Sequence, residues 1–338
     1  MSREVTSGPV CRAEHVWTNL DALCQDFGVP NLFLRILVAA AVCVGLLGGC
    51  ARSVGQNESG LVDDSRPLVL TTFTVLADMA RNVAGDHLSV ESITKAGAEI
   101  HGYEPTPGDL RNAEKAELIL DNGLGLESWF EKFVERVPAP HAVVSEGVDP
   151  VFIRADAYAG KANPHAWMSP VVAETYVDNI AAAFVDLDPA HADDYRDNAE
   201  SYKVQLRAVG AELRANLNRL PANQRALVSC EGAFSYLARD FDLQEAYLWP
   251  VNAEQEGTPK QVVAAIDFVK ENDVPAVFCE STVSDKAQLQ VAEDTGARFG
   301  GKLFVDSLSE EGGPVPTYLD LLTYDARTIT DALVGNRS

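Results

Sequence analysis

The chain alternates strand-like apolar runs with helix-like amphipathic runs, and one long uninterrupted helical segment divides this alternation. Segment 189–220 has one internal glycine, no proline after its start, and apolar residues near helical spacing, and Pro221 closes it. About thirty residues predict a helix of roughly 45 Å, which is long for a globular protein. On either side, the alternation favours parallel strands with crossover helices. We therefore expect an α/β fold with two lobes, each a mostly parallel sheet flanked by helices, joined by one long rigid helix.

The same pattern sets the expected domain boundaries. The N-terminal α/β lobe is predicted at 67–188, the linking helix at 189–221 and the C-terminal α/β lobe at 222–338. Segment 50–66 is polar, contains Gly and Ser, and lacks periodicity. Such a composition is typical of a flexible tether.

Three hydroxyl–proline pairs mark expected helix starts, since a hydroxyl can cap the helix and proline suits its first position. The pairs are Thr106-Pro107, Ser169-Pro170 and Thr258-Pro259. Asp109 and Gln261 stand three residues after their caps and complete capping-box patterns.

An unbroken apolar run, ILVAAAVCVGLL, extends from Ile36 to Leu47. A run of about 10–14 apolar residues fits the core of a signal peptide better than a membrane span. A buried helix is the alternative, but small residues and a cysteine follow at once. Leu47-Gly48-Gly49-Cys50 resembles a bacterial lipobox, so we expect residues 1–49 to be removed as a signal peptide. Lipidated Cys50 would then anchor the protein on the extracytoplasmic face of the cell membrane.

The first 28 residues contain several acidic side chains and are unlike a short basic leader. One hypothesis is that translation begins at Val29. Detection of a precursor peptide containing Trp17 would contradict it.

Two cysteines remain in the mature chain besides Cys50, namely Cys230 and Cys279. The sequence has no CxxC pair, so a thiolate zinc site is unsupported. Both cysteines precede a glutamate after similar strand-like runs, which leaves a disulfide open. The interpretation we favour from sequence is two buried free thiols.

The formal net charge is −23, and the sequence pI is about 4.5. Nucleic-acid binding needs a basic footprint, so this balance argues against it. Acidity of the whole chain is more often a solubility trait than a sign of cation binding.

Two of the six histidines stand out by their context. His101 follows a strand-like region, and His165 lies just before a predicted helix start. Binding residues concentrate at such junctions in open α/β folds. The other histidines of the mature chain are expected at the surface: His87, His141 and His191.

Four acidic residues follow predicted strands and should stand at the carboxyl edge of a sheet. They are Glu231, Asp306, Glu280 and Asp121. Position alone does not choose among them.

Four spaced motifs carry a resemblance to a known family. They are HGYEPTPGDLRNAEKAELILDNGLGLE, NPHAWMSP, SCEGAFSYLARDFDLQEAYLWPVNAEQEGTPKQV and LFVDSLSEEGGPVPTYLDLL. In this order, over about residues 67–335, they resemble the metal-binding-lipoprotein family of ABC-transporter solute-binding proteins, the manganese/iron/zinc group. By position, the resemblance implies His101, His165, Glu231 and Asp306 as metal ligands. Two departures are Asn163, where Asp is common, and Cys230, where a small residue is usual.

Two imidazoles and two carboxylates can offer four to six donor atoms, because a carboxylate binds through one oxygen or two. This flexibility suits manganese or ferrous iron, whereas zinc needs only four donors in a tetrahedral arrangement. Family members that favour zinc usually carry a histidine at the third position and a His-rich loop, and this chain has Glu231 and no such loop. We therefore expect Mn(II), with Zn(II) and Fe(II) as alternatives.

The resemblance also implies an ABC permease and its ATPase subunit as partners of a monomeric protein. Because His101 and His165 lie in one half and Glu231 and Asp306 in the other, bound metal would hold the halves together. An enzyme is not expected, since all four ligands are protein groups and no HExxH or GxSxG motif occurs. A surface adhesin lipoprotein is the alternative of another class.

Overall fold

The computed structural model describes residues 65–335 except 128, 135–136, 155–157 and 252–256. The predicted signal peptide, the predicted lipidation site Cys50 and nearly all of the predicted tether lie outside the described residues. The described residues belong to one compact unit.

The N-terminal half contains a four-stranded parallel sheet in the order β2-β1-β3-β4. Alternate strand residues face opposite sides, as a pleated strand requires. Val69 and Leu120 pack with helices α3 and α6, whereas Leu70 and Ile119 pack against α4 and α5. The elements are β1 (Leu68–Thr71), α3 (Thr74–Ala84), β2 (Ser89–Ser92), α4 (Pro107–Ala113), β3 (Leu118–Asp121), α5 (Phe130–Val134), β4 (His141–Val143) and α6 (Ala173–Leu187).

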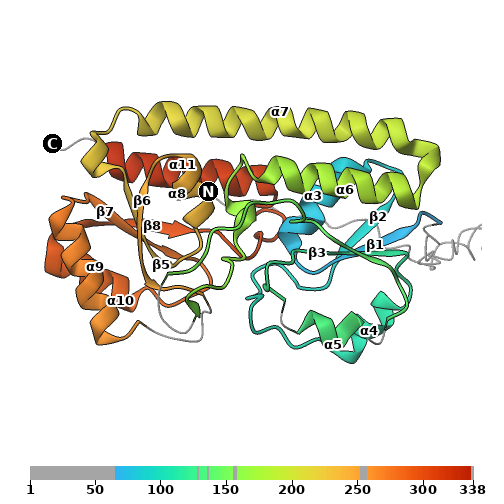
Figure 1. The fold of residues 1–338 in the computed structure, drawn as a ribbon, viewed down its shortest axis with the longest axis horizontal. Coiled ribbons are helices and arrows are strands. Elements are labelled where there is room, and N and C mark those ends of the chain that lie inside the picture. The colour runs from blue at the N-terminus through green and yellow to red at the C-terminus, as the bar shows by residue number, and fades with distance from the viewer. Residues whose placement is uncertain (1–64, 128, 135–136, 155–157, 252–256, 336–338) are drawn as a thin grey trace, which may run out of the picture. The chain divides into compact units, whose positions relative to one another are not determined.

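The C-terminal half is also built from parallel strands. β5 pairs with β6 and β7 pairs with β8, while β5 and β7 lie side by side. Helices α9 and α10 pack together along one side of these strands (Figure 1). The elements are β5 (Ala226–Glu231), α8 (Ser235–Asp240), β6 (Gln244–Trp249), α9 (Pro259–Glu271), β7 (Ala276–Glu280), α10 (Lys286–Thr295), β8 (Arg298–Leu303) and α11 (Tyr318–Val334).

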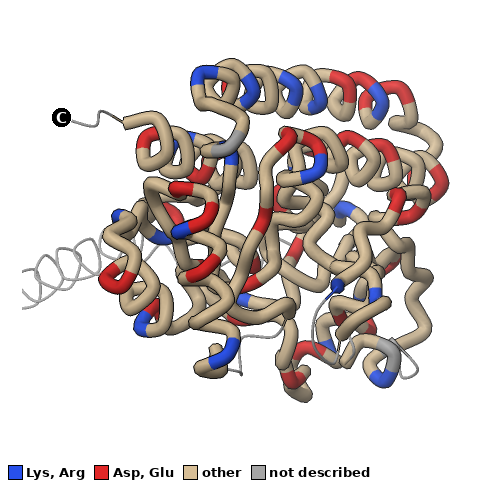
Figure 2. Tube along the Cα trace, turned by 60° about the vertical axis from the view of Figure 1, so that its left-hand side comes forward, with Lys and Arg blue, Asp and Glu red and all other residues tan. Residues whose placement is uncertain are grey.

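The long helix α7 (Ala192–Leu217) has 26 residues and extends over both halves (Figure 1). It is shorter than the predicted segment 189–220, because Pro189–His191 forms a separate 3-10 turn and the helix ends before Pro221. It packs on α3, α6 and α11 through a buried stripe of helical spacing: Tyr195, Ala199, Tyr202, Leu206, Leu213 and Leu217. Its exposed residues include both acidic and basic side chains, and both colours follow the helix in Figure 2.

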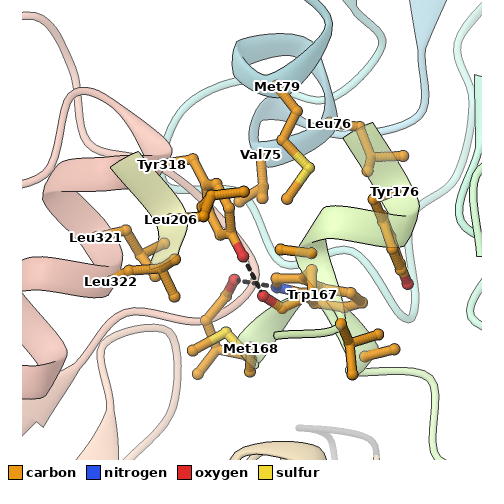
Figure 3. Packing of buried hydrophobic residues seen from close by; sticks show 14 of the residues in the cluster. Val75, Leu76, Met79, Trp167, Met168, Tyr176, Leu206, Tyr318, Leu321 and Leu322 are labelled. Atoms are coloured by element: carbon orange, nitrogen blue, oxygen red, sulfur yellow. Dashed lines mark hydrogen bonds between the residues drawn. The ribbon is translucent and has the colours of Figure 1, made fainter. Parts of the chain in front are cut away.

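Trp167 shows that the two halves share one core. Its ring is fully buried and lies 5.0 Å from the ring of Phe73 in the N-terminal half. Its indole N–H donates to Val305 O at 3.1 Å, and Tyr318 OH donates to the Trp167 carbonyl (Figure 3). Apolar residues of α3, α6, α7 and α11 belong to this same cluster. Contacts of this kind limit how far the halves can move independently.

The fold class is confirmed: two α/β halves with parallel strands are joined by one long helix. The capping boxes at Thr106 and Thr258 are also present. The third helix start is displaced, because α6 begins at Ala173, after a 3-10 turn at Ala166–Met168. The domain boundaries stay predictions.

The interpretation of Cys230 and Cys279 as free thiols is wrong. The two residues form a disulfide that joins β5 to β7, with their Cα atoms 4.8 Å apart. They are separated by 49 residues in sequence. The side-by-side packing of β5 and β7 brings them together, and no local sequence pattern encodes that neighbourhood.

We expect replacement of both Cys230 and Cys279 by alanine to lower the free energy of unfolding by about 2–4 kcal/mol, because the crosslink restricts the unfolded chain. Denaturant unfolding of the oxidised protein and the double variant measures the difference. A reductant should destabilise the wild-type protein by a similar amount and leave the variant unchanged. A double variant as stable as the oxidised wild type would contradict the expectation.

Candidate metal centre

The four predicted ligands come from four separate segments. His101 lies in a turn between β2 and α4, and His165 precedes the 3-10 turn Ala166–Met168. Glu231 is the last residue of β5, and Asp306 follows the end of β8. Parallel strands end at the same edge of a sheet, so this is where the fold can gather side chains from distant parts of the sequence.

The reactive atoms of these side chains converge. His101 Nε2 and His165 Nε2 are 3.1 Å apart. Glu231 Oε1 lies 3.4 Å from the first nitrogen and 3.7 Å from the second, and Asp306 Oδ1 lies 3.9 Å from each. The structure therefore brings all four predicted residues around one point, while their role as ligands stays a prediction.

The cluster is closed off from solvent. The side chains of His165, Glu231 and Asp306 are fully buried, and that of His101 is 6% exposed. Burial lowers the pKa of His101 to about 4, against a smaller opposing effect of the Glu99 carboxylate. Burial also lowers the pKa of His165 well below its usual value, and His101 adds to this effect. Both imidazoles are thus held in the neutral form that coordinates a metal.

Asp306 provides a test of whether a cation fits. Burial raises its pKa to about 7, and Glu99 raises it further. The carboxylate is fully buried, and a hydrogen bond from Thr282 only partly opposes the rise in its pKa. Burying a carboxylate without an opposite charge is costly, and a divalent cation would supply that charge. The donor set therefore fits a metal ion.

Backbone contacts shape the segments that carry two of the predicted ligands. The Glu99 carboxylate accepts from His101 N at 2.7 Å and from Gly102 N at 3.0 Å, which fixes the turn that carries His101. Gly232 follows Glu231, and a Cβ at this position would lie 2.8 Å from Pro250 O. Only glycine therefore lets these two segments of the chain approach so closely.

The other acidic candidates do not join the cluster. Glu280 Oε2 accepts from Glu231 N at 3.0 Å, and burial raises the pKa of Glu280 to about 8. Asp121 lies 3.0 Å from His141 Nδ1. Glu280 therefore supports the backbone of a predicted ligand, a role that strand-end position alone could not distinguish from ligation.

The remaining histidines lie toward the surface, as expected. The ring of His87 stacks on that of His191 at 3.9 Å. Each pairs with an aspartate, Asp194 and Asp188 respectively. The His141 side chain is half exposed.

A hollow of about 580 Å³ lies beside the cluster. His101 is the one predicted ligand among its lining residues, which also include Tyr158, Lys161 and Pro164. Lys161 Nζ stands 5.0 Å from the centre of the Tyr158 ring. No sequence pattern predicts this hollow, because separate segments of the chain line it.

A two-lobed α/β fold with one long connecting helix and a buried His/Glu/Asp cluster defines the class of metal-binding solute-binding proteins. The family described as "Zinc-uptake complex component A periplasmic" matches residues 69–332. The chain belongs to this family, whose members are periplasmic substrate-binding proteins of metal ABC transporters. Solute-binding proteins are a non-enzyme class.

Individual relatives support the assignment. The iron-binding protein YfeA of Yersinia pestis is 56% identical over 262 residues, which cover 77% of this chain and 84% of YfeA. The manganese ABC transporter substrate-binding lipoprotein PsaA of Streptococcus pneumoniae is 32% identical over 308 residues, which cover 88% of this chain and 99% of PsaA.

Solved structures agree with this fold. The Mn-bound periplasmic metal-binding protein of Candidatus Liberibacter asiaticus is 36% identical with a TM-score of 0.75, covering 79% of this chain and all of that one. The periplasmic zinc-binding protein TroA of Treponema pallidum is 26% identical with a TM-score of 0.73, and the match covers 79% of this chain and 99% of TroA. Within the described part of the chain, we find no helix both long and apolar enough to cross a bilayer.

We expect Mn(II) to stabilise the folded protein, because the ion neutralises the buried Asp306 carboxylate. At a free concentration about 100-fold above Kd, binding adds about 2.7 kcal/mol to the free energy of unfolding. Asp306→Asn should remove most of this gain without lowering the stability of the metal-free protein. Denaturant unfolding with and without Mn(II) measures both quantities, and an undiminished gain in the variant would show that Asp306 is not a ligand.

Proposed function

We propose that this protein captures Mn(II) through His101, His165, Glu231 and Asp306 and delivers it to the membrane permease of an ABC importer. The observation that carries the proposal is the convergence of two neutral imidazoles and two carboxylates in a buried site, where each carboxylate has an oxygen within 3.9 Å of both imidazole Nε2 atoms. With neutral imidazoles, two ionised carboxylates balance the charge of a divalent ion.

The choice of manganese rests on the donor set. Nitrogen and oxygen ligands with up to six donor atoms suit Mn(II) and Fe(II), whereas zinc is satisfied by four. Cys230 and Cys279 are joined in a disulfide, so neither offers a thiolate beside the site. Related proteins are named for iron, manganese and zinc, so their names do not identify the metal that this protein binds. Fe(II) and Zn(II) are the alternatives.

The proposal places the protein on the extracytoplasmic face of the cell membrane, held by lipid on Cys50. It acts as a monomer with an ABC permease and its ATPase subunit. Several relatives are named as substrate-binding lipoproteins of ABC transporters, which supports this arrangement. A purely adhesive surface lipoprotein would not need a buried cluster of convergent metal donors.

We further propose that the metal reaches the site through the hollow beside His101. This side chain is the most exposed of the four, and it lines the hollow directly. The exposed Lys161 stands at the same hollow, so an incoming cation passes a positive charge.

Glu231→Gln should weaken Mn(II) binding by more than about tenfold, because it removes one of the two charges that balance the ion. Glu280→Gln is the matched control, since Glu280 also follows a half-cystine at a strand end, and the glutamine oxygen can still accept the hydrogen bond from Glu231 N. We expect the control to stay within about threefold of the wild-type affinity. Calorimetric titration measures both variants, and equal affinities for Glu231→Gln and wild type would show that Glu231 is assigned wrongly.

His101→Ala should lower the metal content of the protein purified from Mn(II)-supplemented medium, because it removes a donor and opens the site to water. Elemental analysis beside the wild-type protein measures the change. An unaltered metal content would undermine the transport function.

Lys161→Glu should accelerate Mn(II) association about threefold at low salt, since it replaces a repulsive charge near the route by an attractive one. The difference should shrink as ionic strength rises. Lys270→Glu on α9 makes the same charge change away from the hollow and should leave the rate unaltered. Stopped-flow experiments measure the Mn(II) association rates of both variants and of the wild type. Equal rates for Lys161→Glu and the wild type would show that the metal takes another route.

A further inference from the structure

Asn163 is a buried amide placed between His165 and the C-terminal half. Its Oδ1 accepts from His165 N at 3.0 Å and lies 2.9 Å from His165 Nδ1. Its Nδ2 donates to Gly232 O at 2.6 Å and to Ser235 Oγ at 3.2 Å. An amide side chain has two N–H donors and one oxygen with two lone pairs, so these four contacts use its whole capacity.

Two backbone groups fix the orientation of this amide. The backbone N–H of His165 can only donate and the carbonyl of Gly232 can only accept, so the side-chain oxygen must face His165. An oxygen that faces Nδ1 requires the proton to sit on Nδ1. The other nitrogen, Nε2, then presents its lone pair to His101, Glu231 and Asp306.

The same amide joins His165 to the chain beside Glu231. Gly232 follows Glu231 directly, and Ser235 opens α8 in the C-terminal half. Tyr236 OH adds a bond to Asn163 O at 2.8 Å, and the adjoining Trp167 donates to Val305 O. His165 is thus fastened to the half that carries Glu231 and Asp306, although its segment precedes α7.

His101 is held differently. Its backbone is fixed by Glu99 from its own turn, and its side chain borders the hollow. The four donors therefore do not divide into one pair from each half. His165, Glu231 and Asp306 are tied together, and His101 lies at the hollow beside the site.

We propose that Asn163 is the positioning residue of the metal site. It sets the tautomer of His165 and fixes this ring against Glu231 and Asp306 before the metal arrives, so that three donors are preformed and His101 completes the set. This inference rests on the proposed function.

An amide suits this position better than a carboxylate. Aspartate would keep an oxygen for His165 but would place a second oxygen about where Nδ2 now donates to Gly232 O. Asn163→Asp should therefore preserve the Nδ1–H tautomer while losing the bond to Gly232.

The test combines ¹⁵N NMR of the histidine rings in the metal-free protein with Mn(II) titration. In the wild type we expect His165 as the Nδ1–H tautomer. Asn163→Ala should give a mixture of tautomers and weaken Mn(II) binding about 10- to 100-fold, the usual effect of losing the partner of a ligating histidine. Asn163→Asp should restore the Nδ1–H tautomer. Asn179→Ala is the control, since it removes an amide that donates to the carbonyls of Val144 and Glu146 and not to the chain beside Glu231, and its affinity should stay within about threefold of wild type.

The proposal is overturned if Asn163→Ala keeps both the tautomer and the affinity of the wild type, or if the wild-type His165 carries its proton on Nε2. If Asn163→Ala does not fold, the proposal is overturned when His165 carries its proton on Nε2 in Asn163→Asp. A wild-type protein that binds neither Mn(II) nor Zn(II) would refute the proposed function instead, while the NMR measurement on the metal-free protein would still test the placement of Asn163.

Discussion

The burial of the Asp306 carboxylate beside two neutral imidazoles is the constraint on which the rest of the site depends. A fully buried carboxylate is costly inside a protein when no opposite charge compensates it. Its raised pKa expresses that cost in the metal-free protein. A divalent cation would remove it by supplying positive charge to Asp306 and Glu231 and an acceptor for the lone pairs of His101 and His165. This arrangement fits a cation among the four side chains.

The scaffold keeps this arrangement in place. One core extends from α3 and α6 to α11 beneath α7, and Trp167 lies within it immediately beyond His165. The disulfide joins the ends of β5 and β7 directly before Glu231 and Glu280, and Glu280 in turn holds the backbone of Glu231. These links favour a preformed binding site and local movement at His101 over a wide separation of the halves.

Much of this architecture could be predicted from sequence, because its signals are local. Alternating apolar runs predicted the parallel strands, and Thr106 and Thr258 with their capping boxes marked helix starts. The four site residues followed from motifs that resemble a known family, not from position, since Glu280 and Asp121 occupy similar strand ends. The disulfide, the hollow beside His101 and the bonds of Asn163 to Gly232 and Ser235 depend on how distant segments pack, and no local pattern encodes them.

Anomalous X-ray diffraction at the manganese absorption edge, from crystals of the Mn(II)-loaded protein, tests the central claim most directly. We expect one strong peak enclosed by His101 Nε2, His165 Nε2 and the carboxylates of Glu231 and Asp306. A strong peak elsewhere on the molecule, with none among these four side chains, would contradict it.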